Sequence, residues 1–348
     1  MRADPVDVFL SFRVALHIHV MSPKCKRFLP RPYQDKAVRE VLTLYQDGAR
    51  KMLLHLPTGA GKTIIATLII ERLLPLIDAG KVLFIAHRKE LLDQTAEKLK
   101  QHLPGLAISI DQGARRADPA AQVIIASIQS LGKRKDAYRP EQFSLIVCDE
   151  CHRALAPSWV EVIEHFNDER DGDALLLGMT ATPRRTDGRS ALDLFDLVAY
   201  EIARPELKDL CYLVPIQYWG VKAALSLDQL KRSGGDFQVG ALSAVMDTPQ
   251  VRALTLRAWE DKARGRKTLA FCSSVRHAHR LAADFAARGH RAAVLDGRTR
   301  IREEILERFR RGDVELLLNY GVLTEGFDDP SIQCVLLARP TTSPLVYN

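Results

Sequence analysis

Short runs of apolar residues, each followed by a polar loop, alternate with amphipathic segments along most of the chain. Such runs are typical of strands buried on both faces, and the amphipathic segments between them are typical of helices. The runs predict strands at residues 52–56, 81–86, 123–126, 143–148 and 174–177 in the first half of the chain, and at residues 268–272, 291–295, 314–318 and 334–338 in the second half. This alternation predicts an α/β fold with mostly parallel sheets and helices on both faces.

The alternation fades in the middle of the chain and then resumes, which predicts two domains. Their expected limits are residues 25–205 and 253–348, joined by a connector at residues 206–252. Residues 1–24 are predicted to be an N-terminal extension, because their apolar patch is interrupted by charged and histidine residues and lacks the pattern of a signal peptide. The first 20 residues are interpreted either as a disordered arm or as the product of an upstream start site.

A glycine-containing turn at residues 56–63 lies between the first predicted strand and an apolar helix. Strand, glycine turn and helix form the setting of a phosphate-binding loop, because backbone N–H groups of the turn and of the helix N-terminus point at an anion. The lysine of this turn would contact the β- and γ-phosphates, and the threonine hydroxyl after it would bind Mg²⁺. Leu56 departs from the usual pattern, which has glycine at that position. The candidate nucleotide-binding residues of the turn are Thr58, Gly59, Ala60, Gly61, Lys62 and Thr63.

Two adjacent carboxylates follow the strand predicted at residues 143–148. Asp149 would hold Mg²⁺, and Glu150 would position and deprotonate the attacking water. The alternative is a solvated acidic turn, which the repulsion between adjacent carboxylates disfavours in the absence of a metal. Thr180 and Thr182, after the next predicted strand, can link their hydroxyls to this acidic tip.

Other polar residues lie near the predicted strands. Gln34 begins a helix-like segment just before the phosphate loop, and its amide can both donate to and accept from an adenine edge. A solvent-facing glutamine at a helix start is the alternative. Arg88, Ser127 and Gln129 follow the strands at residues 81–86 and 123–126, and ligands of parallel sheets bind at the carboxyl ends of their strands.

The six cysteines do not suggest a disulfide framework in a chain of 348 residues. Residues 148–152 match the spacing of a haem attachment site, but no convincing secretion signal accompanies them, and no second Cys/His pair lies at the spacing of a zinc site. We therefore predict reduced thiols and a cytoplasmic location. No apolar run approaches the length of a membrane span, and no membrane partner is expected.

Several segments in chain order resemble the motifs of superfamily 2 helicases, in the DEAH/DECH group that includes type III restriction and repair motors. Those of the first RecA-like domain are residues 56–63, 86–94, 127–131, 149–152 and 178–183, and those of the second are residues 271–274 and 324–328. The resemblance implies two RecA-like domains that use ATP and Mg²⁺ to move along DNA or RNA. It implies catalytic roles for Lys62, Asp149 and Glu150, and nucleotide contacts from Gly326 and Asp328. We expect nucleic-acid contacts from Arg88, Ser127, Gln129 and Thr324, and coupling by His152, Thr180 and Thr182.

The sequence departs from this family at two places. Relatives have an arginine where Glu303 or Glu304 falls, so no role is assigned to that turn. The chain also ends at Asn348, before the helix whose arginines reach the γ-phosphate in relatives. We therefore expect a fragment or truncated product in which hydrolysis is impaired.

The charge balance agrees with a polyanionic partner. There are 50 lysines and arginines against 43 aspartates and glutamates, a formal net charge of +7. The sequence therefore predicts an ATP-dependent DNA or RNA helicase or translocase. Two alternatives are a nucleic-acid clamp that binds ATP with little turnover, and the motor subunit of a restriction or repair nuclease system.

Overall fold

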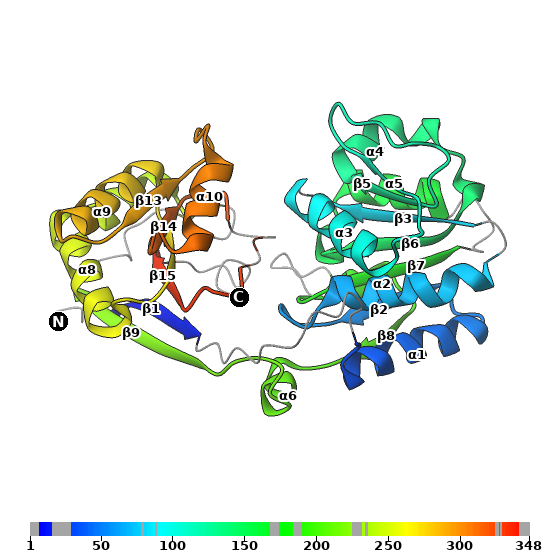
Figure 1. The fold of residues 1–348 in the computed structure, drawn as a ribbon, viewed down its shortest axis with the longest axis horizontal. Coiled ribbons are helices and arrows are strands. Elements are labelled where there is room, and N and C mark those ends of the chain that lie inside the picture. Colours follow the sequence, from blue (N-terminus) through cyan, green and yellow to red (C-terminus); the bar gives the residue numbers. More distant parts are fainter. Residues whose placement is uncertain are drawn as a thin grey trace. The chain divides into compact units, whose positions relative to one another are not determined.

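The structure is a computed structural model that describes residues 7–15, 29–77, 80–87, 89–167, 174–183, 190–224, 232–233, 236–323, 327 and 329–340. The chain divides into two compact units: a first unit, Met21–Leu213, and a second unit formed by Met1–Val20 and Val214–Asn348 (Figure 1). Among the described helices, none has the length and apolar character that crossing a membrane requires.

The first unit is built on a seven-stranded sheet in which all neighbouring strands run parallel. The strand order is β4-β5-β3-β6-β7-β2-β8. The strands are β2 (Lys51–His55), β3 (Lys81–Ala86), β4 (Ile108–Asp111), β5 (Val123–Ser127), β6 (Phe143–Asp149), β7 (Leu175–Thr180) and β8 (Leu197–Glu201). The helices are α1 (Pro32–Gln46), α2 (Lys62–Leu73), α3 (Lys89–His102), α4 (Ile128–Arg134), α5 (Pro157–Asn167) and α6 (Arg204–Asp209).

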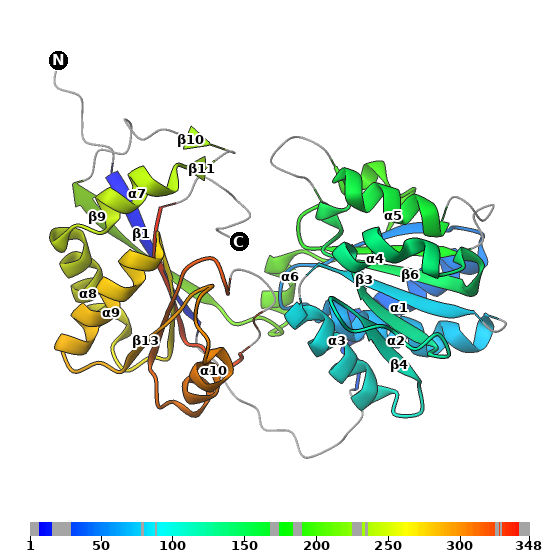
Figure 2. The ribbon, with the colours of Figure 1, turned by 90° about the horizontal axis from the view of Figure 1, so that it is seen from above.

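Both faces of this sheet are buried under helices. In β2, Met52 and Leu54 pack in a cluster that includes residues of α1, α2 and α3, whereas Leu53 packs in a second cluster with residues of α4 and α5. Figure 2 shows α4 and α5 on one side of the sheet and α2 and α3 on the other. Because successive side chains of a strand point to opposite faces, a strand covered on both sides is apolar along its whole length. The predicted α/β fold with a parallel sheet is confirmed.

The second unit contains a six-stranded sheet of mixed direction, in the order β13-β14-β12-β15-β1-β9. Its parallel strands are β12 (Thr268–Cys272), β13 (Ala292–Leu295), β14 (Leu316–Asn319) and β15 (Cys334–Ala338), and its other strands are β1 (Asp7–Ala15) and β9 (Ile216–Ala224). A short hairpin, β10 (Arg232–Ser233) and β11 (Asp236–Phe237), lies outside this sheet. The helices are α7 (Val239–Met246), α8 (Pro249–Ala263), α9 (Val275–Ala287) and α10 (Arg302–Arg311). Helices α8 and α9 cover one side of the sheet and α10 covers the other (Figure 2).

The structure divides the chain differently from the sequence prediction. Strand β1 lies in the predicted extension 1–24, and β9 and α7 lie in the predicted connector 206–252. β1 and β9 pair antiparallel along their whole length and extend the parallel part of the sheet, because β1 also pairs with β15. Helix α7 is held to α8 by buried apolar contacts. Residues 214–252 are thus part of the second unit, and the first unit ends at Leu213.

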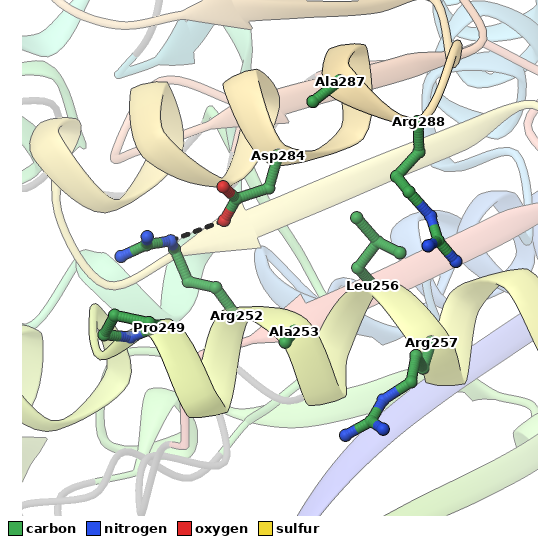
Figure 3. A pocket seen from close by; sticks show the side chains of 8 residues that line it. All are labelled: Pro249, Arg252, Ala253, Leu256, Arg257, Asp284, Ala287 and Arg288. Atoms are coloured by element: carbon green, nitrogen blue, oxygen red, sulfur yellow. Dashed lines mark hydrogen bonds and ion pairs between the residues drawn. The ribbon is translucent and has the colours of Figure 1, made fainter.

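A network of ion pairs fastens α7, α8 and α9 to one another. Asp247, the residue after α7, is buried, and its carboxylate lies 3.0 Å from Arg252 on α8 and 3.0 and 3.1 Å from Arg276 and Arg280 on α9. Arg252 also lies 2.6 Å from Asp284 of α9, and both residues line a pocket of about 440 Å³ (Figure 3). The three guanidinium groups compensate the charge of this buried carboxylate, which would be costly to leave unpaired.

His277 of α9 is a buried neutral base within the same region. Its Nδ1 accepts a hydrogen bond from the N–H of Ser273 at 3.3 Å and lies 2.8 Å from the Ser273 hydroxyl. Burial, opposed by the charges of Asp247 and Asp284 and helped by that of Arg252, lowers the pKa of His277 to about 4. The folded protein therefore favours the uncharged ring.

We expect the second unit to lose stability as the pH falls from 7 to 5. The unfolded chain binds a proton at the ordinary histidine pKa of about 6.5, whereas folded His277 resists protonation until about pH 4. Linkage then gives a loss of about 2 kcal/mol in the free energy of unfolding over this range, levelling off below the folded pKa. Urea unfolding at the two pH values measures the loss. His277→Gln cannot titrate and should lack this component, so an equal pH dependence in variant and wild type would contradict the assignment.

Candidate nucleotide-binding site

The predicted phosphate loop has the backbone geometry that anion binding needs. It joins β2 to α2, with Gly59 at φ 86° and Gly61 at φ 76°, both in the left-handed region that favours glycine. A Cβ on Gly61 would lie only 2.6 Å from Nε2 of Gln34. The first hydrogen bonds of α2 run from the N–H groups of Ile64 and Ile65 to the carbonyl of Gly61, so the N–H groups of the two preceding helical residues have no partner within the helix. This is the arrangement of an anion site at a helix N-terminus.

The surroundings of Leu56 show why a leucine fits at the position where the usual pattern has glycine. Its side chain is fully buried in the core cluster under α1 and α2, and its N–H donates to the carbonyl of Thr180 at 2.9 Å. The residue therefore prolongs the contact of β2 with β7 by one step. The turn of the loop begins after it, where the glycines lie.

Tyr33 and Gln34 brace the loop from α1. The Tyr33 hydroxyl donates to the carbonyl of Ala60 at 2.7 Å, and Gln34 Nε2 donates to the same carbonyl at 3.2 Å. Gln34 Oε1 accepts from the N–H of Arg31 at 2.9 Å, so both ends of this buried amide have partners within the chain. The adenine contact of Gln34 stays a prediction. Sequence reasoning missed Tyr33, whose position beside the glutamine was its only signal.

The acidic tip lies next to the loop because β6, β7 and β2 are neighbours in the sheet. Asp149 is the last residue of β6 and is buried, and its Oδ1 accepts from the N–H of Glu150 at 3.0 Å. Glu150 adopts φ 50°, a left-handed conformation that is uncommon for a residue with a side chain. This turn directs Glu150 Oε1 to within 3.4 Å of the Lys62 Nζ. Residues 88 positions apart in sequence thus form an ion pair at one edge of the sheet.

The two carboxylates have opposite electrostatic surroundings. Burial, together with the neighbouring Glu150, raises the pKa of Asp149 to about 6 against the opposing charge of Lys62. Burial also acts to raise the pKa of Glu150, but the hydrogen bond from His152 and the charge of Lys62 outweigh it and lower that pKa. Glu150 is therefore ionised at neutral pH in this state, and Asp149 is a buried oxygen donor that an added cation would stabilise.

His152, Thr180 and Thr182 connect the acidic tip to the end of β7. His152 Nδ1 lies 3.4 Å from Glu150 Oε2 and 3.2 Å from the Thr180 hydroxyl. That hydroxyl also accepts from the N–H of Thr182 at 3.1 Å. The structure thus brings together the residues predicted to couple the acidic tip to the neighbouring strand.

The two described residues of the first unit that were predicted to contact nucleic acid differ in exposure. The Ser127 side chain is buried and caps α4, where its Oγ accepts from the N–H of Ser130 at 3.2 Å and lies 2.9 Å from the Ser130 hydroxyl. This cap accounts for the serine without a ligand, whereas Gln129 is exposed. Arg88, Thr324, Gly326 and Asp328 lie outside the residues that the structure describes.

The cysteines beside the acidic tip are structural. Cys148 and Cys151 are free, fully buried thiols in the core cluster under α4 and α5, and burial raises the pKa of Cys148 to about 12. In the described part of the chain, no group of three or more histidine, cysteine or acidic side chains is arranged as a metal cluster.

The chain matches two family models, one in each unit. Residues 27–185 match the res subunit of type III restriction enzymes, and residues 250–348 match the helicase conserved C-terminal domain. The two models follow each other in chain order, and the first spans the phosphate loop, the acidic tip and Thr180.

Curated relatives include helicases from two yeasts. The chain is 30% identical to a protein of Saccharomyces cerevisiae described as an ATP-dependent helicase, IRC3, over 90% of this chain and 47% of that protein. It is 31% identical to the Schizosaccharomyces pombe protein described as the mitochondrial ATP-dependent helicase irc3, over 88% of this chain and 51% of that protein. The chain thus spans about half the length of these relatives.

A solved structure gives the same fold. The fragment of a protein assigned as an HsdR subunit of a type I restriction enzyme from Vibrio vulnificus YJ016 superimposes with a TM-score of 0.67 at 22% identity, over 92% of this chain and 60% of that one. At this identity the likeness concerns the fold alone. Family models and relatives agree: the chain joins a segment that matches the res subunit of type III restriction enzymes to one that matches the helicase conserved C-terminal domain, and it is similar over most of its length to proteins described as ATP-dependent helicases.

Proposed function

We propose that this chain is the ATP-dependent motor core of a DNA or RNA helicase or translocase. The observation that carries the proposal is that the phosphate loop, the acidic tip and Thr180 meet at the carboxyl ends of β2, β6 and β7. Lys62 and Glu150 lie 3.4 Å apart there. A lysine on a glycine loop next to paired carboxylates is the arrangement used for transferring a phosphoryl group to water.

The residues of this edge fit ATP and Mg²⁺. The left-handed glycines hold the loop open for phosphate oxygens, and the helix N-terminus offers N–H donors to them. Asp149 is a buried carboxylate, and Thr63 is the second residue of α2, so their oxygens are the proposed metal ligands. When bound, Mg²⁺ would neutralise charge that develops on the phosphate oxygens. Gln34 is the proposed adenine contact, and Gly326 and Asp328 are the other proposed nucleotide contacts.

Glu150 is the proposed general base. Its lowered pKa keeps it ionised at neutral pH, and the hydrogen bond from His152 orients the carboxylate. With phosphates in the loop, Lys62 has an alternative anionic partner, and Glu150 is then free to accept a proton from the attacking water. A movement of Glu150 would reach the end of β7 through His152, whose Nδ1 lies 3.2 Å from the Thr180 hydroxyl, and from there Thr182, whose N–H donates to that hydroxyl.

Nucleic acid is the proposed polymer substrate. The net charge of +7 supports a polyanion. Arg88, Gln129 and Thr324 are the proposed contacts to phosphate and sugar, with Ser127 acting through the cap of α4. Contacts of this kind position a strand without reading its sequence, so we expect weak sequence preference.

We expect the affinity for single-stranded DNA to fall steeply with salt. Each phosphate neutralised by a cationic side chain contributes about −0.7 to the slope of log affinity against log salt for single strands. Arg88 is the one cationic side chain among the proposed contacts, so it sets a slope of about −0.7, and each further lysine or arginine that neutralises a phosphate would steepen the slope by the same amount. Fluorescence anisotropy with a labelled oligonucleotide between low and moderate salt measures it. A flat response would contradict both a motor and a clamp on nucleic acid.

A second candidate function is the motor part of a restriction nuclease system. It is favoured by the match of residues 27–185 to the res subunit of type III restriction enzymes. The chain is also 29% identical to the Escherichia coli EcoAI type I restriction endonuclease subunit, over 72% of this chain and 33% of that one. Affinity purification from the native cell would recover a nuclease partner under this proposal and none under the helicase proposal.

ATP hydrolysis separates a motor from a clamp. A motor hydrolyses ATP faster when single-stranded DNA or RNA is present, whereas a clamp binds both ligands without turnover. Comparing DNA with RNA of equal length identifies the polymer.

The free thiols among the described residues favour a reducing compartment, and a cytoplasmic location is proposed on that basis.

A further inference from the structure

The last residue of the first unit, Leu213, packs against the phosphate loop. A Cβ built on Gly59 would lie 2.8 Å from Cδ2 of Leu213, so the leucine side chain rests on the loop where a methyl group would not fit. Leu213 is only partly buried and belongs to the apolar cluster that includes Ala60. The next residue, Val214, is the first of the second unit along this part of the chain.

Tyr212 reaches the same loop through Tyr33. The two rings are 5.2 Å apart between centroids, and the Arg31 guanidinium lies 4.8 Å from the centroid of the Tyr212 ring. The Tyr33 hydroxyl in turn donates to the carbonyl of Ala60. Consecutive residues at the end of the unit thus hold consecutive residues of the loop: Leu213 holds Gly59, and Tyr212 holds Ala60 through Tyr33.

The two residues are fixed in place by a tight turn after α6. The N–H groups of Tyr212 and Leu213 both donate to the carbonyl of Leu207, at 2.8 and 3.1 Å. Leu207 is fully buried in the core cluster under the loop. Cys211, at φ 58°, makes the left-handed turn that directs the chain back. Residues 207–213 therefore form a turn that hydrogen bonds and a buried side chain hold in place, and we call this segment the lever.

We propose that Tyr212 and Leu213 are positioning residues that couple the state of the phosphate loop to the segment of chain entering the second unit. This inference rests on the proposed binding of ATP phosphates to the loop. Phosphate binding turns the amides of residues 59–61 toward the anion, and the contact at Gly59 leaves no free space, so Leu213 moves with the loop. Coupling is reciprocal: a change in the position of residue 214 alters the affinity of the loop for nucleotide.

Hydrogen exchange tests the coupling directly, because the amides of Tyr212 and Leu213 share one acceptor. Exchange is measured in the full chain with and without a non-hydrolysable ATP analogue and magnesium. The peptide covering residues 56–65 reports filling of the loop, and the peptide covering residues 207–214 reports the lever. We expect nucleotide to change the exchange rate of both peptides, the second by about fivefold or more, the lower end of ordinary coupling between sites.

Three variants make the test specific. Leu213→Ala removes the contact with Gly59 and should abolish the response of residues 207–214 while the loop still gains protection. Leu213→Met keeps the volume and should restore the response. Leu210→Ala is the matched control, because Leu210 lies in the same turn with half of its surface exposed, and this variant should respond like the wild type.

Three outcomes would overturn the proposed coupling between the phosphate loop and residues 207–213. A protected loop with an unchanged lever peptide in the wild type overturns the coupling and leaves the proposed nucleotide site intact. A lever that responds equally in Leu213→Ala also overturns it. An unprotected loop means that the nucleotide site itself is absent, and the proposed function fails together with the inference.

Discussion

Lys62→Ala should weaken ATP binding by about tenfold to a hundredfold or more, the range expected for losing a contact with a charged donor. The loss has two parts. The phosphates lose the cation of the loop, and Glu150, which lies 3.4 Å from Lys62 in the wild type, becomes an uncompensated negative charge beside them. Calorimetric titration with ATP and magnesium measures the change.

The matched control for this variant is Lys100→Ala. Lys100 is an exposed lysine in α3 of the same unit, and its removal changes the net charge equally without touching the loop. The control should bind ATP like the wild type. Undiminished affinity in Lys62→Ala, with the fold intact by circular dichroism, would show that the phosphates bind elsewhere.

Glu150→Gln should lower ATP turnover by about 10²–10⁴-fold, the usual contribution of a general base. The amide keeps the shape of the side chain but accepts no proton. Nucleotide affinity should be retained or increased, because Lys62 no longer has the carboxylate as a competing partner. Rapid-quench hydrolysis combined with a binding titration separates the two effects.

Glu161→Gln provides the comparison for Glu150→Gln. Glu161 forms a 2.9 Å ion pair with Lys135 on the surface of the same unit, away from the phosphate loop. It should change neither turnover nor binding. If Glu150→Gln lost ATP binding instead of turnover, Glu150 would be a residue that shapes the site and not the base.

The strands that carry the site could be predicted from sequence for a clear reason. β3 and β12 were found at the predicted residues, because both faces of each sheet are covered and these strands are apolar throughout. β1 and β9 were missed because they form an antiparallel pair far apart in sequence, and neither has a continuous apolar run. Pairing between distant segments leaves no local signal in the chain.

The geometry of the site likewise could be predicted only in part from the sequence. Lys62 and Asp149 follow from the chemistry of their motifs, but the αL turn of Glu150 that brings its carboxylate to Lys62 does not, because a glutamate gives no sequence signal for a positive φ. The hydroxyl of Ser127 caps α4, a role that the sequence did not indicate, and its nucleic-acid contact stays a prediction. The contact of Leu213 with Gly59 depends on the path of the chain after α6, which the sequence reads only as a connector.

The central claim is that the edge of β6, β7 and β2 binds ATP as part of a motor that acts on nucleic acid. The most direct measurement is the affinity of the chain for a fluorescent ATP analogue with magnesium, in the absence and in the presence of saturating single-stranded DNA or RNA. A motor requires the two ligands to affect each other, so we predict that one of these polymers changes the ATP affinity by about fivefold or more. An ATP affinity that neither polymer alters, or the absence of ATP binding, would contradict the account.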